Sequence, residues 1–155
     1  MDDATLDSLF WKSKGGAVEF RGRTVSRIFH RTVQPQEAVT VRFIRSTSQP
    51  SQGLLFRLPG GTLRILNQSV KDLSLWSDTF PGEDTLVCET KRPNTLKIWN
   101  AWRSPDGKAI YWIHESGILI EEPSPATVVL RCSDGIGDAD FDDLVVELEF
   151  RSEAA

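Results

Sequence analysis

The chain has 155 residues, of which 18 are basic and 22 acidic, so its formal net charge is −4. This length fits one domain, and a hydrophobic content of 39% is that of a folded chain rather than a disordered one. A pI near 5.2 argues against a general nucleic-acid binder. No apolar run is long enough for a membrane-spanning helix. The N-terminus lacks a basic stretch followed by an apolar one, so we expect a cytoplasmic protein or one exported without a signal peptide.

A short helix is the first element that we expect along the chain. Residues 3–12 place Leu6, Leu9 and Phe10 on one side, which is typical of an amphipathic helix. Beyond it, apolar runs recur at short intervals between groups of Gly, Pro, Asn, Asp and Ser, which is the pattern of β-strands. The runs cover residues 17–20, 24–30, 38–45, 53–58, 62–66, 84–89, 95–102, 109–114, 117–121, 126–132 and 144–151.

The turns and the last strand indicate how these strands are arranged. Residues 104–107 read Ser-Pro-Asp-Gly, which favours a tight turn and therefore a hairpin of 95–102 with 109–114. In 144–151 apolar residues alternate with mostly charged ones, so one face is buried and the other exposed. The pattern predicts a single all-β domain, an antiparallel, jelly-roll-like β-sandwich, in which residues 1–14 form a short helical or flexible N-terminal segment.

Four arginines occupy odd-numbered positions before the third run, so in a regular strand they would lie on the same face. If residues 21–31 form one unbroken strand, their guanidinium groups line one face and could meet a phosphate, an acidic glycan or an acidic partner protein. The other interpretation is a solvated outer face or an edge strand protected by charge. The residues are Arg21, Arg23, Arg27 and Arg31.

The two cysteines, Cys88 and Cys132, both lie in apolar, β-like runs. We interpret them as buried thiols that act as small hydrophobic side chains. The alternative is a single disulfide between them, if the chain is exported. Neither cysteine has the sequence spacing of a zinc site.

Tryptophans are frequent, and three of them, Trp99, Trp102 and Trp112, lie on the predicted hairpin. Trp99 and Trp102 lie on opposite faces of a regular strand, so both cannot face the same core. We expect one of them to be an exposed platform for a sugar, with Asn100 and Tyr111 beside it. The alternative is that the tryptophans fill a large sandwich core.

The acidic residues are concentrated in one loop before the last strand. Residues 138–143 contain four aspartates, and without these four the other 18 acidic residues equal the 18 basic ones, so the formal charge excess equals this cluster. Carboxylates this close repel one another and need a cation, basic partners or full solvation. Hard oxygen ligands interspersed with glycine suit Ca²⁺, whereas the alternative is a solvated turn in which Asp side chains cap backbone N–H groups. The candidate ligands are Asp134, Asp138, Asp140, Asp142 and Asp143.

Residues 138–146 read Asp-Ala-Asp-Phe-Asp-Asp-Leu-Val-Val. This segment resembles the D-x-D-[F/Y]-[N/D]-D-[L/M]-V element of calcium-associated β-sandwich domains in surface and secreted proteins of bacteria. The resemblance implies that Phe141 and Leu144 anchor the loop in the core, and that the ligands of the ion are Asp138, Asp140, Asp142 and Asp143. Asp142 stands where Asn is commoner in that element.

Together these features predict a non-enzymatic, calcium-binding recognition module with a structural Ca²⁺ and with carbohydrate as its ligand. The alternative is an intracellular protein–protein interaction module that uses the arginine face around residues 21–31, with the acidic loop structural. A hydrolase that uses the acidic cluster is a third hypothesis. His30 and His114 are the two histidines, and no complete catalytic motif accompanies them.

Overall fold

The structure is a computed structural model that describes residues 5–14, 16–47 and 49–152. Within these residues the fold is all-β apart from one short helix, which confirms the predicted class. The elements are α1 (Leu6–Ser13), β1 (Val18–Phe20), β2 (Arg23–Val25), β3 (Phe29–Val33), β4 (Glu37–Ser46), β5 (Gln52–Arg57), β6 (Thr62–Ile65), β7 (Gln68–Val70), β8 (Asp72–Trp76), β9 (Glu83–Glu89), β10 (Asn94–Arg103), β11 (Ala109–Ile110), β12 (Gly117–Ser124), β13 (Thr127–Ser133) and β14 (Leu144–Arg151).

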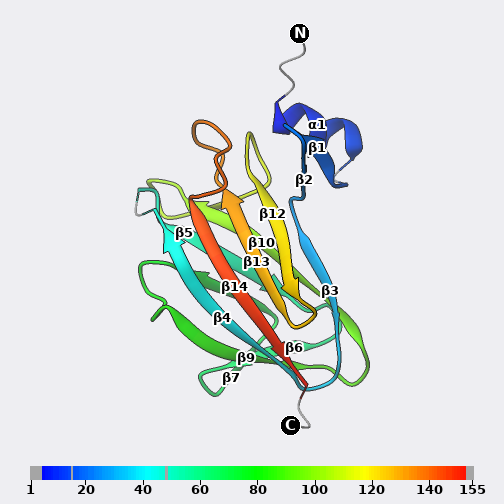
Figure 1. The fold of residues 1–155 in the computed structure, drawn as a ribbon. Coiled ribbons are helices and arrows are strands. Elements are labelled where there is room, and N and C mark those ends of the chain that lie inside the picture. The colour runs from blue at the N-terminus through cyan, green and yellow to red at the C-terminus, as the bar shows by residue number, and fades with distance from the viewer. Residues whose placement is uncertain (1–4, 15, 48, 153–155) are drawn as a thin grey trace.

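Two antiparallel sheets pack against each other as a sandwich (Figure 1). The larger sheet has seven strands in the order β12-β13-β14-β4-β9-β6-β7. The smaller sheet has the order β11-β10-β5-β8, and β3 also pairs with β10. The predicted antiparallel β-sandwich is therefore confirmed.

The main core lies between the sheets and follows from the alternation in the strands. On β14, Leu144, Val146 and Leu148 are fully buried in this core, whereas Glu147 and Glu149 are partly exposed and Arg151 is exposed. Cys88 and Cys132 belong to this core as free thiols, as predicted. Burial raises the pKa of Cys88 to about 12 and also raises the pKa of Cys132, so both thiols stay protonated.

The N-terminal helix and the β1–β2 hairpin form a separate small unit above the end of β12 (Figure 1). Helix α1 lies where the sequence predicts a helix, although residues 3 and 4 fall outside the described residues. Its Leu6 and Phe10 belong to a second apolar cluster, which also contains Ala139 and Phe141 of the acidic loop. The unit therefore covers one side of that loop.

Some strands differ from the prediction. The hairpin of β10 with β11 is confirmed at Trp102↔Ile110 and Arg103↔Ala109, but β11 ends after two residues. The predicted run 24–30 is split between β2 and β3, and β7 and β8 had no counterpart among the predicted runs. The chain that follows β11 is a loop, which places its side chains outside both sheets.

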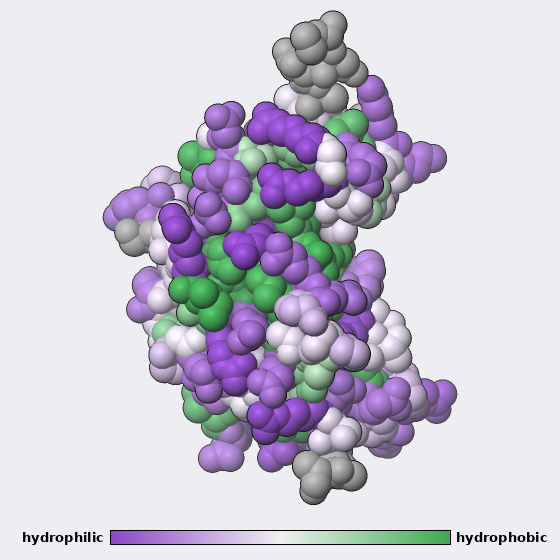
Figure 2. Space-filling model, in the orientation of Figure 1, coloured by the Kyte–Doolittle hydropathy of each residue, from purple (hydrophilic) through white to green (hydrophobic). Residues whose placement is uncertain are grey.

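The outer face of the larger sheet divides into a charged part and an apolar part. Arg42 forms ion pairs with Glu83, Glu147 and Glu149 across neighbouring strands. Figure 2 shows apolar residues gathered in the upper half of the visible face, below the N-terminal unit, and mostly hydrophilic residues in the lower half. No described helix is long and apolar enough to cross a membrane.

Candidate functional site

Two loops meet at one end of the sandwich. Residues 111–116 follow β11, and the acidic loop, residues 134–143, connects β13 to β14. Gly135 packs so closely that a Cβ built on it would lie 2.7 Å from the ring of Trp102 and 3.1 Å from the carbonyl oxygen of Ile113. Only glycine fits this contact, which joins the two loops.

The root of the acidic loop holds two carboxylates. Asp134 is 3% exposed, and its carboxylate accepts hydrogen bonds from Gln52 Nε2 and from Ile136 N, each at 2.9 Å. Its backbone N–H donates to Asp143 Oδ2 at 2.9 Å. Burial, together with the charges of Asp134 and Asp140, raises the pKa of Asp143 to about 6. The ionised form of Asp143 is therefore disfavoured at its position.

The tip of the loop is more open. Asp138, Asp140 and Asp142 are exposed, and Asp142 N donates to Asp140 Oδ1 at 3.2 Å, which is the capping interaction of the alternative interpretation. Within the described residues, no three His, Cys, Asp or Glu side chains are grouped so as to hold a metal ion. The structure thus brings Asp134, Asp140 and Asp143 into electrostatic contact and leaves Asp138 and Asp142 in solvent.

Basic side chains of the described residues do not neutralise this cluster. None of the ion pairs formed by the described residues involves an aspartate of the acidic loop. The backbone of Asp143 is nevertheless fixed, because its N–H donates to the carbonyl of Cys132 and its carbonyl accepts from Thr47 N. The loop therefore keeps its carboxylates in place with no cation from the described side chains.

Two buried amides support the root of the loop from the smaller sheet. Gln52 is fully buried, and its Oε1 has no hydrogen-bond partner among the described residues. Asn100, also buried, donates through Nδ2 to the carbonyl of Ser133 at 3.0 Å. Sequence reasoning missed Gln52, although a glutamine that begins an apolar strand is a signal of a buried polar contact.

The structure corrects the expected aromatic platform. Trp99 is 5% exposed and Trp102 is 3% exposed, so neither offers a free face. Trp102 packs beneath the acidic loop at Gly135. Trp99, on the opposite face of β10, is covered by Tyr111 and by Trp112, whose ring centroid lies 5.1 Å away. Of the rings packed together around Trp99, the exposed one is Trp112, at 37%, which was not among the residues expected to bind a ligand.

The loop that carries Trp112 has an unusual backbone. Trp112 and His114 have positive φ values of 59° and 53°, a conformation that side chains with a Cβ rarely adopt. The guanidinium group of Arg27 holds the loop, since it donates to the carbonyls of Trp112 at 2.7 Å, of His114 at 2.9 Å and of Ser116 at 3.4 Å. Arg27 is therefore a positioning residue for this loop.

The four predicted arginines do not form one row. Residues 21–31 are not an unbroken strand, because a turn follows β1 and the chain leaves β2 before β3 begins. Each guanidinium group instead lies over a different phenylalanine ring, at 4.0 to 5.6 Å from its centroid. The pairs are Arg21 with Phe20, Arg23 with Phe141, Arg27 with Phe10 and Arg31 with Phe150. The common face expected from an unbroken strand is therefore wrong.

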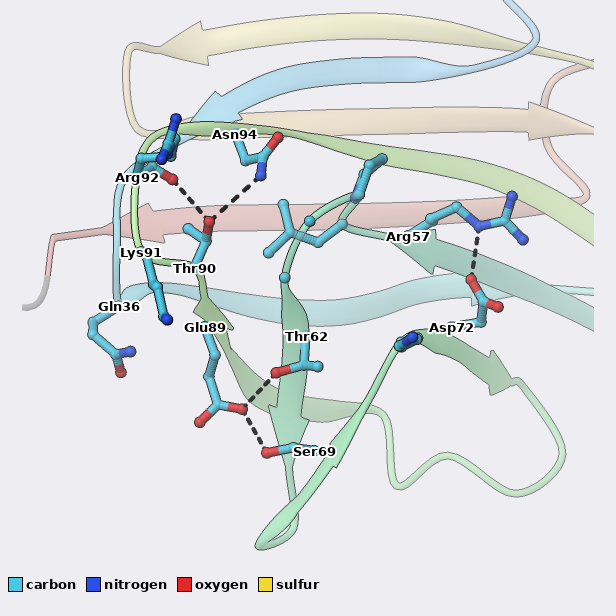
Figure 3. A pocket seen from close by; sticks show the side chains of 15 residues that line it. Gln36, Arg57, Thr62, Ser69, Asp72, Glu89, Thr90, Lys91, Arg92 and Asn94 are labelled. Carbon is cyan, nitrogen blue, oxygen red and sulfur yellow. Dashed lines mark hydrogen bonds and ion pairs between the residues drawn. The ribbon is translucent and has the colours of Figure 1, made fainter.

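An open pocket of about 1090 Å³ lies at the opposite end of the sandwich (Figure 3). Its walls come from residues 57–62, 69–72 and 89–94, together with Gln36. These segments lie far from the acidic loop, because β5 and β10 run from one end to the other, with Gln52↔Trp102 at the acidic end and Arg57↔Lys97 towards the pocket. No pattern in the sequence predicts this pocket.

The similarity of residues 138–146 to calcium-associated β-sandwich domains is limited to a short motif. Comparison with known proteins gave no matching family model, no matching curated protein and no matching solved structure. These comparisons neither support nor oppose a calcium site, so its chemistry rests on the residues described above.

Proposed function

We propose that the protein is a non-enzymatic, calcium-binding recognition module in which the acidic loop holds Ca²⁺ in a structural role. The observation that carries this proposal is the position of Asp143. Its half-buried carboxylate lies near those of Asp134 and Asp140, and it has no basic partner among the described residues. Like charges at such a site favour a bound cation.

The donor chemistry suits calcium. The acidic loop supplies carboxylate oxygens and contains neither His nor Cys, which disfavours zinc or copper. Ca²⁺ takes six to eight oxygen ligands and accepts backbone carbonyls and water among them. Asp134, Asp140 and Asp143 would hold the ion, with Asp138 and Asp142 turned inward from the solvent. Bound calcium would supply positive charge that links the root of the loop to its tip.

A proton is the competing occupant of the same position. Because the pKa of Asp143 is raised to about 6, a proton neutralises its carboxyl in mildly acidic solution. Near neutral pH the carboxyl ionises, and a divalent cation would then replace the proton. The proposal therefore requires that calcium affinity falls as the pH is lowered through about 6.

Thermal unfolding at pH 7 in EDTA and then in excess Ca²⁺ tests the site. A ligand that binds only the folded chain at 100 times its Kd raises the free energy of unfolding by about 2.7 kcal/mol. We expect this gain in the native chain and its loss in the Asp140→Asn/Asp142→Asn and Asp143→Asn variants. Glu122→Gln is the control, since it removes one exposed charge with no ion-pair partner among the described residues. A native chain that does not respond to calcium contradicts the metal site.

Carbohydrate is the ligand that we propose for the same end of the sandwich. Trp112 and Tyr111 pack edge-to-face with centroids 4.8 Å apart, and Trp112 keeps part of its ring exposed beside the acidic loop. A partly exposed aromatic ring that is held by other rings can stack against the apolar face of a sugar at little entropic cost. The strained backbone at Trp112 also supports a functional role for this ring.

A glycan array tests this ligand class, with Trp112→Ala and Trp11→Ala as matched variants. Both remove an exposed tryptophan, but Trp11 lies on α1 and is 85% exposed. We expect Trp112→Ala to lose the glycan signal and Trp11→Ala to keep it. Silence of the native chain across all glycans would overturn the carbohydrate proposal and leave the protein–protein interaction module as the better hypothesis.

A further inference from the structure

We propose that the pocket at the end of the sandwich opposite the acidic loop binds an acidic saccharide, a short sugar chain that carries carboxylate or sulfate groups. The residues that would hold its anionic groups are Lys71, Lys91 and Arg92, which all line the pocket. This inference goes beyond the proposed calcium site and does not depend on it.

The charge balance of the pocket is the first reason. Its two acidic residues already have partners: Asp72 pairs with Arg57 at 2.7 Å, and Glu89 pairs with Arg64 at 3.4 Å. Hydrogen bonds from Ser69 and Thr62 lower the pKa of Glu89, which keeps it ionised and committed to these donors.

Three cations of the pocket do not have ion-pair partners of this kind among the described residues. Lys71, Lys91 and Arg92 form no ion pair with any described residue. Three positive charges therefore remain around one pocket in a chain whose formal net charge is −4. Cations without partners around a concave surface raise the local concentration of anionic ligands.

The shape of the pocket is the second reason. Its volume of about 1090 Å³ exceeds what a single inorganic ion needs and suits a ligand of several sugar units. One wall is a tight turn in which Gly61 N donates to Leu58 O at 3.0 Å and Gly60 has a φ of 81°. A Cβ on Gly61 would lie 2.6 Å from the carbonyl oxygen of Glu89, so this wall has to be glycine.

The polar groups between the cations favour a saccharide. Thr90 and Asn94 of the segment 89–94 reach the same pocket as Gln36, and a hydrogen bond of 3.5 Å joins Asn94 to Thr90 (Figure 3). Amide and hydroxyl groups of this kind bind sugar hydroxyls. No aromatic side chain lines the described pocket, which disfavours a nucleobase or a neutral sugar that depends on stacking.

An acidic peptide fits less well. Peptides commonly bind such an end by adding a strand to a free sheet edge, where main-chain hydrogen bonds give the affinity. The edge strands beside this pocket are β7, which has three residues, and β8, which has five. Such short edges offer few main-chain partners, and a peptide would depend on the same three cations.

Binding to fluorescently labelled hexasaccharides tests the proposal. The full chain in EDTA is titrated with a heparin hexasaccharide, a hexagalacturonate and, as a neutral reference, cellohexaose. We expect binding of at least one acidic saccharide and none of cellohexaose, and the two acidic arms distinguish sulfate from carboxylate. Lys91→Ala/Arg92→Ala is expected to weaken that binding by at least about tenfold, the effect of losing charged hydrogen bonds.

The control is Lys12→Ala/Arg45→Ala, which removes the same charge from exposed positions on α1 and β4. We expect its affinity to stay within about twofold of the native value. An equal loss in both double variants would show unspecific attraction and overturn the proposal, as would an absence of binding to both acidic saccharides. Equal affinity for a hexaglutamate peptide would overturn the saccharide assignment. Because EDTA is present throughout, none of these results depends on calcium.

Discussion

The two ends of the sandwich differ in the sign of their charges and in how far those charges are exposed to solvent. At the acidic end, Asp134 is buried and Asp143 is half-buried, and both are fixed by hydrogen bonds to the backbone. At the pocket end, Lys71, Lys91 and Arg92 are exposed and carry no ion pair with a described residue. Charges fixed in a low-dielectric site affect folding, whereas solvated charges mainly affect binding.

This difference also concerns packing. The acidic end is covered by the N-terminal unit, whose apolar cluster includes Phe141. The pocket end is closed by short turns around Leu58, which belongs to the main core. Substitutions at the acidic end should therefore disturb a loop, a helix and a proposed metal site together. Substitutions of the exposed cations of the pocket should disturb only a ligand.

The largest effect is expected from Phe141→Ala. Phe141 is buried between the acidic loop and the N-terminal unit, and Arg23 lies over its ring at 5.6 Å. Removing a buried phenylalanine side chain costs about 3–4 kcal/mol of unfolding free energy. We expect that loss in urea denaturation, together with faster proteolysis at α1 and loss of the calcium response.

Leu58→Ala is the matched variant at the other end. Leu58 is buried at 2% exposure, so its truncation should also cost about 2–4 kcal/mol. Its calcium response and the protection of α1 from proteolysis should stay native. If Leu58→Ala exposed α1 as strongly as Phe141→Ala does, the two ends would not be independent.

The sequence predicted the fold better than it predicted the site. The strands with strong alternation, β4, β10 and β14, were all expected, because burial of one face dictates the spacing of their apolar residues. Strand β7 was missed because polar residues lie on both of its faces. Strand β8 does alternate, with Leu73 and Leu75 on one face and Asp72 and Ser74 on the other, so its pattern was present in the sequence and was overlooked. The turn before β11 was recognised from its Pro-Asp-Gly residues, but not how soon β11 ends.

At the site, composition identified the acidic loop but not its neighbours. The exposure of Trp99 depends on the loop that folds over it, and no periodicity within β10 reports that loop. Gln52 reaches Asp134 across 82 residues of sequence, and Arg27 reaches Trp112 across 85. Such contacts depend on tertiary packing, which local patterns do not specify.

A smaller effect than that of Phe141→Ala is expected from Arg27→Ala. The Arg27 side chain is 13% exposed, burial lowers its pKa, and its guanidinium group satisfies three carbonyls of the loop with the positive φ values. Removing it takes a charged donor away from these three carbonyls, at a cost of about 2–3 kcal/mol in thermal unfolding.

Two other variants show whether the carbonyl contacts cause this loss. Arg27→Lys keeps the charge, but one ammonium group cannot span three carbonyls, so it should recover about half of the stability. Arg31→Ala removes a guanidinium group that also lies over a phenylalanine but donates to a single backbone carbonyl, that of Pro125. Its cost should stay at or below about 1 kcal/mol. Equal losses for Arg27→Ala and Arg31→Ala would assign the effect to ring stacking instead.

A smaller effect of opposite sign is expected from Asp143→Asn. The pKa of Asp143 is raised to about 6 in the folded chain and is near 3.9 when the chain is unfolded, so its contribution to stability is present at acidic pH and is lost as the pH rises from about 4 to 6. Without calcium at pH 7, Asp143→Asn should therefore stabilise the chain, by about 1 kcal/mol once the half-exposed position is allowed for.

The pH profile of that gain is the measurement. It should be small near pH 4 and reach its full value by pH 7, and excess calcium should reverse its sign, because the native chain then gains a ligand that the variant has lost. A destabilised variant at pH 7 in EDTA would show that the carboxylate is stabilising as it stands and needs no cation.

The smallest change in the free energy of unfolding is expected from Lys91→Ala/Arg92→Ala. Such a small change would show that these residues form a binding surface and do not support the fold. Both side chains are exposed on the turn between β9 and β10, and neither forms an ion pair with a described residue. Surface substitutions of this kind change the free energy of unfolding by no more than about 0.5 kcal/mol. Thermal unfolding at low and high salt should therefore match the native chain, while affinity for an acidic saccharide falls. A loss of more than about 1 kcal/mol would mean that these cations support the fold, and the contrast between the two ends would then disappear.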